Sequence, residues 1–365
     1  MEIRKLTMDG LKSLLLSEEV SGWTSLPISP LRLASQAKNP LLRGDDIVMV
    51  LAIENNDLAG YMGALPDQML VGKGKEEHLA WASCIWTAPA ERGKGLAKIL
   101  TETMVQCWQG KLILTEFTPA AAALYHKLDL FETFLVKRGY RYFYRPILWR
   151  LAKNRVSNNG FLLALFKCID FLLNIFLLFR KWLKLSFGKE NKYRAKEADL
   201  NMVADQLLYK SSFERSPQKN SWVFFNPWLS SDKINQCERY YFPTWVPCFR
   251  FSAVVFYDGN GMAIARLVFS RFNEDCKVIS FLQENTDSKI QPDLKKSIEL
   301  FFLGEKISSV LSFDDAYNEV MKQKGSLFFY KRSRKREYLA GKEFCRQLPP
   351  GEYCAGEMDG DPVFT

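Results

Sequence analysis

The apolar positions of the first 150 residues follow two spacing patterns, and together these patterns predict a mixture of strands and helices. Short apolar runs bounded by turn residues predict strands, whereas apolar positions spaced three and four apart predict helices. The strands are expected at 1–6, 46–53, 58–65, 80–86, 112–117 and 140–149. The helices are expected at 9–16, 95–110 and 119–128. Because antiparallel strands come first and strand–helix–strand–helix–strand follows, we expect an α/β fold of the α+β kind with a mixed sheet.

The pattern after residue 192 has a similar order of elements. A helix is expected at 195–212, and a hairpin at 251–257 and 262–270. Strands at 276–282, 308–313 and 326–330 alternate with helices at 292–303 and 314–324. This order echoes that of the first 150 residues, so we expect a second domain of related architecture.

A long apolar helix is expected between these two parts, from Phe161 to Phe187, after a polar linker at 154–159. Lys167, Asp170 and Asn174 are three and four positions apart, so they lie on one narrow stripe of the helix. Basic residues crowd its C-terminal end. These features are typical of a helix in a membrane interface, and equally of one packed between two domains. A membrane span is disfavoured because charges interrupt the apolar run.

We therefore predict three parts: a domain at 1–150, a linker with the amphipathic apolar and basic helix at 151–191, and a second domain at 192–365. The composition agrees with this division. A chain of 365 residues is long enough for two cores, and 47% hydrophobic with 25% charged residues is typical of a folded protein.

The net charge of +9 is compatible with nucleic acid, an anionic membrane surface or a phosphorylated cofactor. The sequence contains neither zinc-finger spacing nor an RNA-binding motif, so nucleic acid is not an expected partner. Eight cysteines without a C-x-x-C pair, and only two histidines, predict no metal site. Free thiols and a charged, strand-like N-terminus indicate a cytoplasmic protein, with peripheral membrane contact through 161–187.

The most specific local feature is the turn from Arg92 to Ala97, which joins the strand at 80–86 to the following helix. Backbone N–H groups of a glycine-bearing turn converge there with the unpaired first N–H groups of the helix, and the helix dipole favours negative charge. Gly93 and Gly95 let the backbone approach an anion closely. The turn therefore predicts a site for a ligand that carries a pyrophosphate.

Two motifs around this turn resemble those of the GNAT superfamily of N-acetyltransferases. The acyl-CoA signature of that family, Arg/Gln-x-x-Gly-x-Gly/Ala, is matched by Arg92, Gly95 and Ala97. The segment Ala122–Leu128 is similar to the second cofactor motif, and Tyr125 is its tyrosine. The resemblance covers residues 1–150 and implies a GNAT-type fold that binds acyl-CoA.

The resemblance also implies a mechanism, the direct transfer of an acetyl group from acetyl-CoA to a primary amine. Tyr125 would act as general acid toward the departing thiolate, and the strand at 80–86 would pair with the pantetheine arm as an extra strand does. Glu116 is the first candidate for the general base and His78 the second; His126 is expected to be structural. The cofactor-binding residues implied are Trp81, Ser83, Ile85, Trp86, Thr87, Arg92, Gly93, Lys94, Gly95, Leu96, Ala97 and Thr118.

The chain departs from the family pattern at two places. Thr118 stands where asparagine is usual, and Leu130-Phe131 where the family has a Gly-Phe pair. These departures bear on the acceptor more than on CoA. By its order of elements, the second domain resembles a degenerate GNAT fold without the CoA signature.

Two other functions stay open. One is a tandem-GNAT transferase that moves an aminoacyl or longer acyl group onto a cell-envelope precursor, and the other is a non-catalytic module that binds acyl-CoA. Aromatic residues of the second half line either a ligand platform or an ordinary core. These residues are Trp222, Phe224, Phe225, Trp228 and Trp245.

Overall fold

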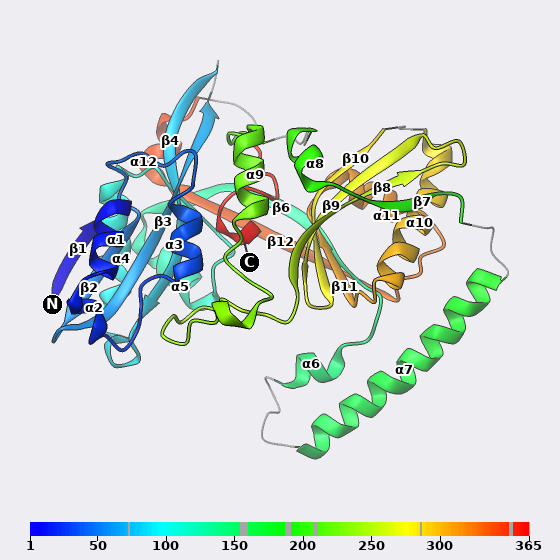
Figure 1. Ribbon diagram of the computed structural model, residues 1–365, viewed down its shortest axis with the longest axis horizontal. Coiled ribbons are helices and arrows are strands. Elements are labelled where there is room, and N and C mark those ends of the chain that lie inside the picture. Colours follow the sequence, from blue (N-terminus) through cyan, green and yellow to red (C-terminus); the bar gives the residue numbers. More distant parts are fainter. Residues whose placement is uncertain are drawn as a thin grey trace. The chain divides into compact units, whose positions relative to one another are not determined.

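The computed structural model describes residues 1–71, 74–153, 160–186, 191–206, 211–284, 287–349 and 353–364 (Figure 1). The predicted linker at 154–159 lies outside the described residues. Contacts divide the chain into two compact units, and each unit combines segments that are far apart in the sequence. Unit 1 consists of Met1–Lys137, Leu200–Phe249 and Lys335–Thr365, and unit 2 of Arg138–Asp199 and Arg250–Arg334. The predicted domain boundaries at 150 and 192 are not those of the two units.

Unit 1 is built around a mixed sheet with the strand order β1-β2-β3-β4-β5-β12-β6. The strands are β1 (Glu2–Leu6), β2 (Met49–Glu54), β3 (Asp57–Val71), β4 (Lys75–Thr87), β5 (Leu112–Thr115), β6 (Phe131–Phe143) and β12 (Tyr330–Gly341). Strands β1 to β4 form an antiparallel meander, and β4 pairs with β5 in parallel. The predicted α/β fold with a mixed sheet is confirmed.

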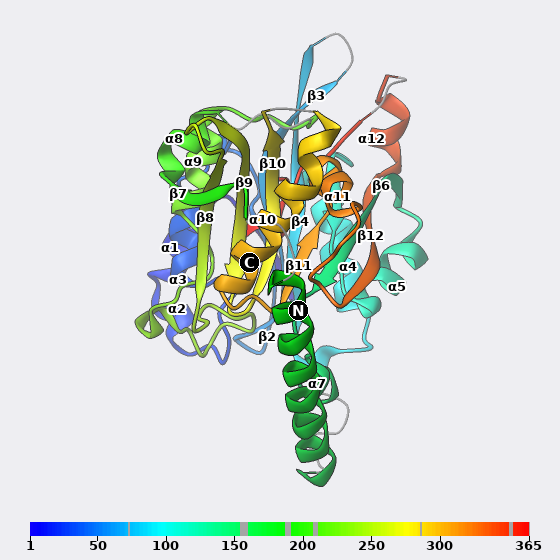
Figure 2. The ribbon, with the colours of Figure 1, turned by 90° about the vertical axis from the view of Figure 1, so that its right-hand side faces the viewer.

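Helices cover both faces of this sheet (Figure 2). On one face lie α1 (Met8–Leu15), α2 (Glu18–Ser21) and α3 (Pro30–Gln36), and on the other α4 (Leu96–Cys107) and α5 (Pro119–Leu128). Successive residues of a strand point to opposite faces. Met49 and Leu51 of β2 therefore enter the core under α1, whereas Val50 and Ala52 enter the core under α4. Burial on both faces explains why β2 is an unbroken apolar run.

Unit 1 also contains elements from the middle and the end of the chain. They are α8 (Leu200–Gln206), α9 (Pro217–Phe225), α12 (Lys342–Gln347) and the short 3-10 helices η2 (Lys233–Asn235) and η4 (Asp361–Phe364), whereas the 3-10 helix η1 (Pro89–Glu91) follows β4 in the first segment. Strand β12 and helix α9 explain why the unit differs from the predicted first domain, since both come from outside residues 1–150. Strand β12 pairs with β5 through Tyr338 to Ala340, and Trp222 of α9 donates its indole N–H to the carbonyl of Ser35 at 2.8 Å.

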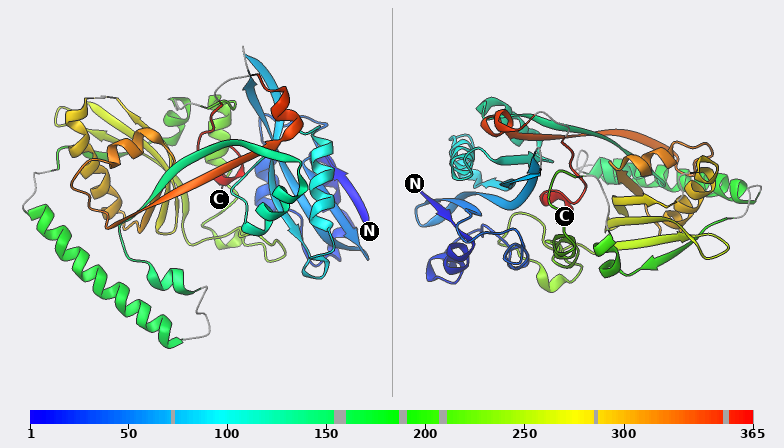
Figure 3. Two further views of the ribbon diagram at one scale, coloured as in Figure 1. Left: turned by 180° about the vertical axis from the view of Figure 1, so that it is seen from behind. Right: turned by 90° about the horizontal axis from the view of Figure 1, so that it is seen from above.

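Unit 2 has strands in the order β6-β11-β10-β9-β8-β7. Its further strands are β7 (Arg194–Ala198), β8 (Phe249–Tyr257), β9 (Ala263–Phe272), β10 (Asp275–Gln283) and β11 (Ser309–Ser312), with the short helix η3 (Ser288–Ile290) after β10. Helices α10 (Gln291–Gly304) and α11 (Asp315–Met321) cover one face (Figure 3). They close a core that includes Phe256, Phe269 and Phe302. The elements predicted between 251 and 324 are confirmed in kind and order.

Helices α6 (Leu148–Lys153) and α7 (Gly160–Ser186) of unit 2 pack against each other. Asp170 of α7 is 4% exposed, and its carboxylate accepts the N–H groups of Leu148 at 3.0 Å and Trp149 at 2.9 Å. Because the first N–H groups of a helix lack partners within it, Asp170 acts as a cap for α6.

Three predicted elements differ in the structure. The strand predicted at 140–149 lies earlier, as β6, because the cap from Asp170 stabilises a helix at 148–153. The helix predicted at 195–212 begins instead as β7, because residues 194–198 pair with β8. The strand predicted at 326–330 is β12 and starts at Tyr330. In the first two cases a partner outside the segment decides the local structure.

Candidate active site

The predicted phosphate turn lies in unit 1 between β4 and α4. Helix α4 begins at Leu96 with Gly95 as its N-cap, and no side chain caps it. Gly93 and Gly95 have φ of +81° and +85°, and a Cβ built on either glycine would meet nothing within 4 Å. Arg92 to Gly95 are exposed. The first N–H groups of α4 therefore face an open turn, which suits a phosphate group.

Side chains tie this turn to its own flanks. The Nε of Arg92 donates to the carbonyl of Thr87 at 3.4 Å, and the Nζ of Lys94 lies 3.0 Å from a carboxylate oxygen of Glu91. Leu96 is 3% exposed and anchors α4 in the core, and Ala97 beside it is half-buried. The backbone of the turn is therefore the part that a ligand can reach.

Strand β4 leaves β5 shortly before the turn. The parallel ladder between them has two residue pairs, Ala80 with Leu112 and Trp81 with Ile113. Further along, Cys84 has a φ of +47°, and the register against β3 shifts at the same place. This β-bulge turns β4 away from its neighbour. Among the described residues, the edge of β4 beyond Trp81 has no ladder partner on the β5 side, so an extended ligand can pair with it.

The predicted cofactor residues of β4 differ in exposure. Trp81, Ser83 and Trp86 are buried, and Ile85 and Thr87 are half-buried. The indole N–H of Trp81 donates to Asp67 at 2.8 Å, and its ring contacts Phe213 with centroids 4.7 Å apart. The side chains of Trp81 and Trp86 are therefore core residues, and β4 offers a ligand chiefly its backbone.

Tyr125 of α5 is 4% exposed and lies edge-to-face between two phenylalanines. Its ring centroid is 5.8 Å from that of Phe117 and 5.7 Å from that of Phe131. Burial, and after it the charge of Asp361, raise the pKa of Tyr125. Its hydroxyl therefore keeps its proton at neutral pH, as a general acid must before it acts.

Glu116 follows β5 and has a φ of +51°, in the left-handed region. Its carboxylate forms an ion pair with Arg336 of β12, whose guanidinium also lies 2.7 Å from Glu357. Two residues later, Thr118 accepts the N–H of Ala121 at 3.2 Å and caps α5. The left-handed residue and the cap together let the chain pass directly from β5 into α5.

The two histidines have different surroundings. The Nε2 of His78 lies 2.8 Å from Asp46, and its ring centroid lies 5.4 Å from that of Trp108. Six residues separate His78 from Cys84 along β4, which corresponds to roughly 20 Å. The structure therefore does not bring His78 to the bulge. His126 is exposed on α5.

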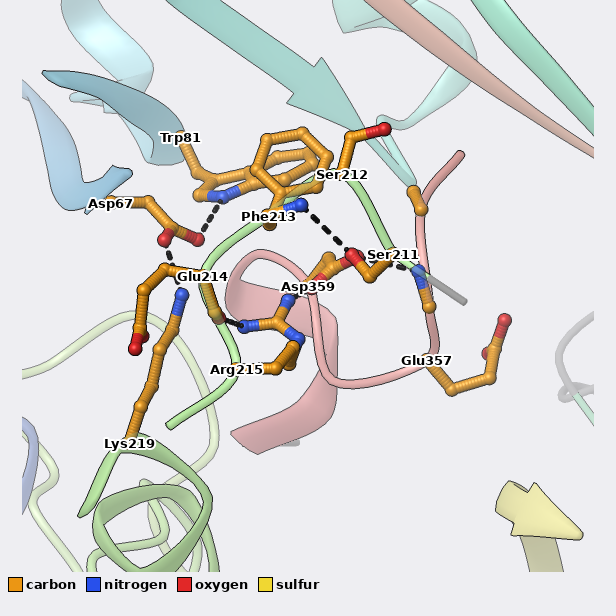
Figure 4. A network of polar contacts seen from close by, with 12 residues as sticks. Asp67, Trp81, Ser211, Ser212, Phe213, Glu214, Arg215, Lys219, Glu357 and Asp359 are labelled. Carbon is orange, nitrogen blue, oxygen red and sulfur yellow. Dashed lines mark hydrogen bonds and ion pairs between the residues drawn. The ribbon is translucent and has the colours of Figure 1, made fainter. Parts of the chain in front are cut away.

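The segment 353–364 brings acidic residues to β4 and its neighbours that the sequence patterns do not predict. Asp361 accepts a hydrogen bond from Ser83 at 2.6 Å, and Asp359 accepts one from Ser211 at 2.7 Å. Figure 4 shows Asp359 also beside Arg215, in a network that includes Asp67 and Trp81. The one signal available in the sequence is the alternation of Glu357, Asp359 and Asp361 in a chain of net charge +9.

The aromatic residues of the second half are mainly core residues of unit 1. Trp222, Phe224 and Trp228 are buried, and Trp228 stacks on Phe364 with centroids 4.6 Å apart. Trp245 is half-buried and Phe225 is 50% exposed. The core alternative is therefore favoured over a ligand platform. Within the described ranges no group of three or more His, Cys, Asp or Glu side chains could hold a metal ion.

The model of the acetyltransferase (GNAT) family matches residues 10–129. This part of the chain belongs to the GNAT family. The match covers the GNAT domain from α1 to the end of α5, including the turn, the bulged strand and Tyr125. No sequence among the curated proteins matches the chain.

Solved structures with a similar arrangement are remote from this chain. A probable N-acyltransferase from Enterococcus faecalis V583 is 9% identical, with a TM-score of 0.46, over 93% of this chain and 71% of that chain. A GCN5-related N-acetyltransferase from Kribbella flavida is 12% identical, with a TM-score of 0.47, over 93% and 70%. N-myristoyltransferase of Saccharomyces cerevisiae with bound myristoyl-CoA is 10% identical, with a TM-score of 0.43, over 93% and 82%.

Proposed function

We propose that the chain is an acyl-CoA-dependent N-acetyltransferase that transfers an acetyl group to a primary amine. The observation that carries this proposal is the open turn at Arg92–Gly95 beside the edge of β4 that has no ladder partner beyond Trp81 among the described residues. The pyrophosphate of CoA would accept hydrogen bonds from the turn and from the first N–H groups of α4. The pantetheine arm would pair with β4 as an added strand does. Acetyl-CoA carries these two groups in the order in which the protein offers the two surfaces.

The proposed reaction needs no acyl-enzyme. The nitrogen of the amine attacks the thioester carbonyl, and the carbon–sulfur bond breaks as the amide forms. Tyr125 would give its proton to the departing thiolate. Glu116, the base predicted from the sequence, has its carboxylate engaged by Arg336. We place the reaction in the cytoplasm, since all eight cysteines are free thiols.

Gly95→Ala is expected to weaken the binding of acetyl-CoA about tenfold or more. Alanine at a φ of +85° costs about 1–2 kcal/mol, and its methyl group enters the space that the pyrophosphate would occupy. Titration calorimetry with acetyl-CoA measures this, and a parallel titration with myristoyl-CoA separates a short from a long acyl donor.

The matched control is Gly261→Ala in the hairpin between β8 and β9. Gly261 has a φ of +80° and equally open surroundings, so alanine at this position imposes a similar backbone strain away from the turn. Binding of acetyl-CoA should be unchanged in this control. If the unaltered protein binds no acyl-CoA at all, the proposed function is wrong.

We also propose that α7 contacts a lipid surface. The window Gly160–Leu177 has 18 residues and a mean hydropathy of 2.0, with 11% of it buried, so by length and composition alone this helix could cross a membrane. A helix that is apolar nearly all round finds its partners in a core or in lipid. Its exposed side chains include Phe161, Phe171, Leu172, Phe176 and Phe179. The net charge of +9 favours anionic headgroups.

Replacing both Phe171 and Phe176 by serine is expected to reduce sedimentation with phosphatidylglycerol vesicles at least tenfold. The two rings are 65% and 62% exposed, and each replacement removes apolar area that lipid would cover. Added salt should weaken binding of the unaltered protein. Leu16→Ser, at a residue 89% exposed on unit 1, is the control and should sediment normally. A protein that stays in the supernatant at low salt contradicts the lipid contact.

A further inference from the structure

The 3-10 helix η4 brings an aspartate from near the end of the chain to the bulge of β4. The Oγ of Ser83 lies 2.6 Å from the Oδ2 of Asp361, across 278 positions of sequence. Ser83 directly precedes Cys84, the residue at which β4 turns away from β5. Asp361 is half-buried, whereas Ser83 is 3% exposed. A carboxylate thus lies beside the part of β4 where the thioester of an acyl-CoA would be.

A buried arginine fixes the direction of this hydrogen bond. Arg32 of α3 is 2% exposed, and its NH2 group lies 2.6 Å from the Oγ of Ser83. Its guanidinium also donates to the hydroxyl of Tyr240 at 2.8 Å and lies 4.0 Å above the ring of Trp228. Because arginine can only donate, the hydroxyl of Ser83 accepts from Arg32 and gives its own proton to Asp361. The carboxylate is therefore held by a donor whose orientation is set from behind the strand.

Several charged and titratable groups surround Asp361. Burial is the largest influence and raises its pKa, and the charge of Glu116 raises it further. The hydrogen bond from Ser83 and the charge of Arg32 act in the opposite direction. Asp361 in turn raises the pKa of Tyr125. Asp361 is therefore electrostatically linked to the proposed general acid and to Glu116, and its proton affinity exceeds that of an ordinary aspartate.

We propose that Asp361 is the general base of the acyl transfer and binds the ammonium group of the acceptor. The proposal rests on the function proposed above and deepens it, because it assigns the acceptor side of the same site. Glu116 suits this role less well, since its carboxylate is engaged by the guanidinium of Arg336. The substrate class follows from the chemistry: a primary amine that arrives protonated and is attracted by a carboxylate.

The protons balance in two transfers. Asp361 takes one proton from the ammonium group, and this leaves a neutral amine. Asp361 later releases the proton to water. The nitrogen of this amine forms a bond to the thioester carbon, and the electrons of the carbon–sulfur bond leave with sulfur. Tyr125 gives its proton to the thiolate, and the second proton of the nitrogen restores Tyr125. The products are the N-acetyl amine, CoA as the thiol and one proton in solution.

The test is the pH dependence of kcat/KM for the amine at saturating acetyl-CoA. Asp361→Asn keeps the shape of the side chain and its hydrogen bond from Ser83 but cannot take a proton. We expect kcat at neutral pH to fall about 10²- to 10⁴-fold, and the acid limb that belongs to Asp361 to disappear. The affinity for acetyl-CoA and the melting temperature should stay close to those of the unaltered protein. An acid limb that persists in Asp361→Asn overturns the assignment.

Two further variants shift the same limb in opposite directions, which a merely structural role would not do. Ser83→Ala removes a hydrogen bond that lowers the pKa of Asp361, so the limb should move to higher pH. Glu116→Gln removes a charge that raises this pKa, so the limb should move to lower pH. If Glu116→Gln abolishes the limb instead, Glu116 is the base.

Failure of the assignment can be told from failure of the proposed function. If the unaltered protein binds no acetyl-CoA, or acetylates none of a panel of primary amines, the proposed function is wrong and this inference falls with it. If it is active and Asp361→Asn keeps both rate and pH profile, the function stands and only the role of Asp361 is refuted.

Discussion

Tyr125→Phe should lower the rate of acetyl transfer about 10²- to 10⁴-fold while leaving the affinity for acetyl-CoA unchanged. The variant loses only the hydroxyl, because phenylalanine keeps the edge-to-face contacts with Phe117 and Phe131. The raised pKa of Tyr125 keeps its hydroxyl protonated at neutral pH, so the proton is available to sulfur as the carbon–sulfur bond breaks and the attacking nitrogen restores it. Single-turnover kinetics with acetyl-CoA and the best amine of a panel measure the rate.

A second buried tyrosine provides the control. Tyr142 of unit 2 is fully buried and donates its hydroxyl to Asn318 at 3.0 Å. Tyr142→Phe should cost about 1 kcal/mol of stability through the lost hydrogen bond and leave the rate of transfer unchanged. A module that only binds acyl-CoA would not be affected by Tyr125→Phe. An unchanged rate of acetyl transfer in this variant would therefore contradict a catalytic role for Tyr125.

The phosphate turn could be predicted from the sequence because all its determinants are neighbours. Gly93, Gly95 and the helix start at Leu96 lie within four positions, and their conformations depend on local sterics and on the N-terminus of α4. Helix α5 was predictable for the same reason, since Thr118 and Pro119 mark its beginning. These two segments also carry the family motifs.

The acceptor side of the site could not be predicted in this way. Ser83 and Asp361 are 278 positions apart, and no periodicity in either segment indicates that they meet. Glu116 was found as a charged residue at the end of a strand, but its ion pair with Arg336 depends on β12 pairing beside β5. Contacts between distant segments also displaced the predicted domain boundaries, because Leu200–Phe249, between the two parts of unit 2, and Lys335–Thr365, after it, belong to unit 1.

Lys219→Met is expected to destabilise the protein by about 3–5 kcal/mol. Lys219 of α9 and Asp67 of β3 form an ion pair in which both side chains are 3% exposed. Methionine fills a similar volume but leaves the carboxylate of Asp67 without its counter-charge in a buried place. Asp67 also accepts the indole N–H of Trp81 at 2.8 Å, so the same change loosens the strand beside the proposed cofactor site (Figure 4). Urea unfolding followed by tryptophan fluorescence measures the loss.

The double variant Asp67→Asn with Lys219→Met separates the cost of an unpaired charge from the worth of the pair. It should recover most of the lost stability, because a neutral buried pair needs no counter-charge. Lys322→Met removes one partner of an exposed pair with Glu319 and should cause no measurable change. If Lys219→Met is no more destabilising than Lys322→Met, the buried pair does not stabilise unit 1.

The stability of the unaltered protein relative to Lys219→Met should rise as the pH increases above 8. Burial, followed by the charge of Arg215, lowers the pKa of Lys219 to about 8, although Asp67 opposes the shift. Between that value and the ordinary lysine value of 10.5, the unfolded chain binds more protons at this residue than the folded chain. Stability increases with pH wherever the unfolded state binds more protons, so the unaltered protein gains stability through Lys219 over this range, whereas Lys219→Met does not. A difference between the two proteins that is constant from pH 7 to 10 would show that Lys219 keeps an ordinary pKa in the folded state.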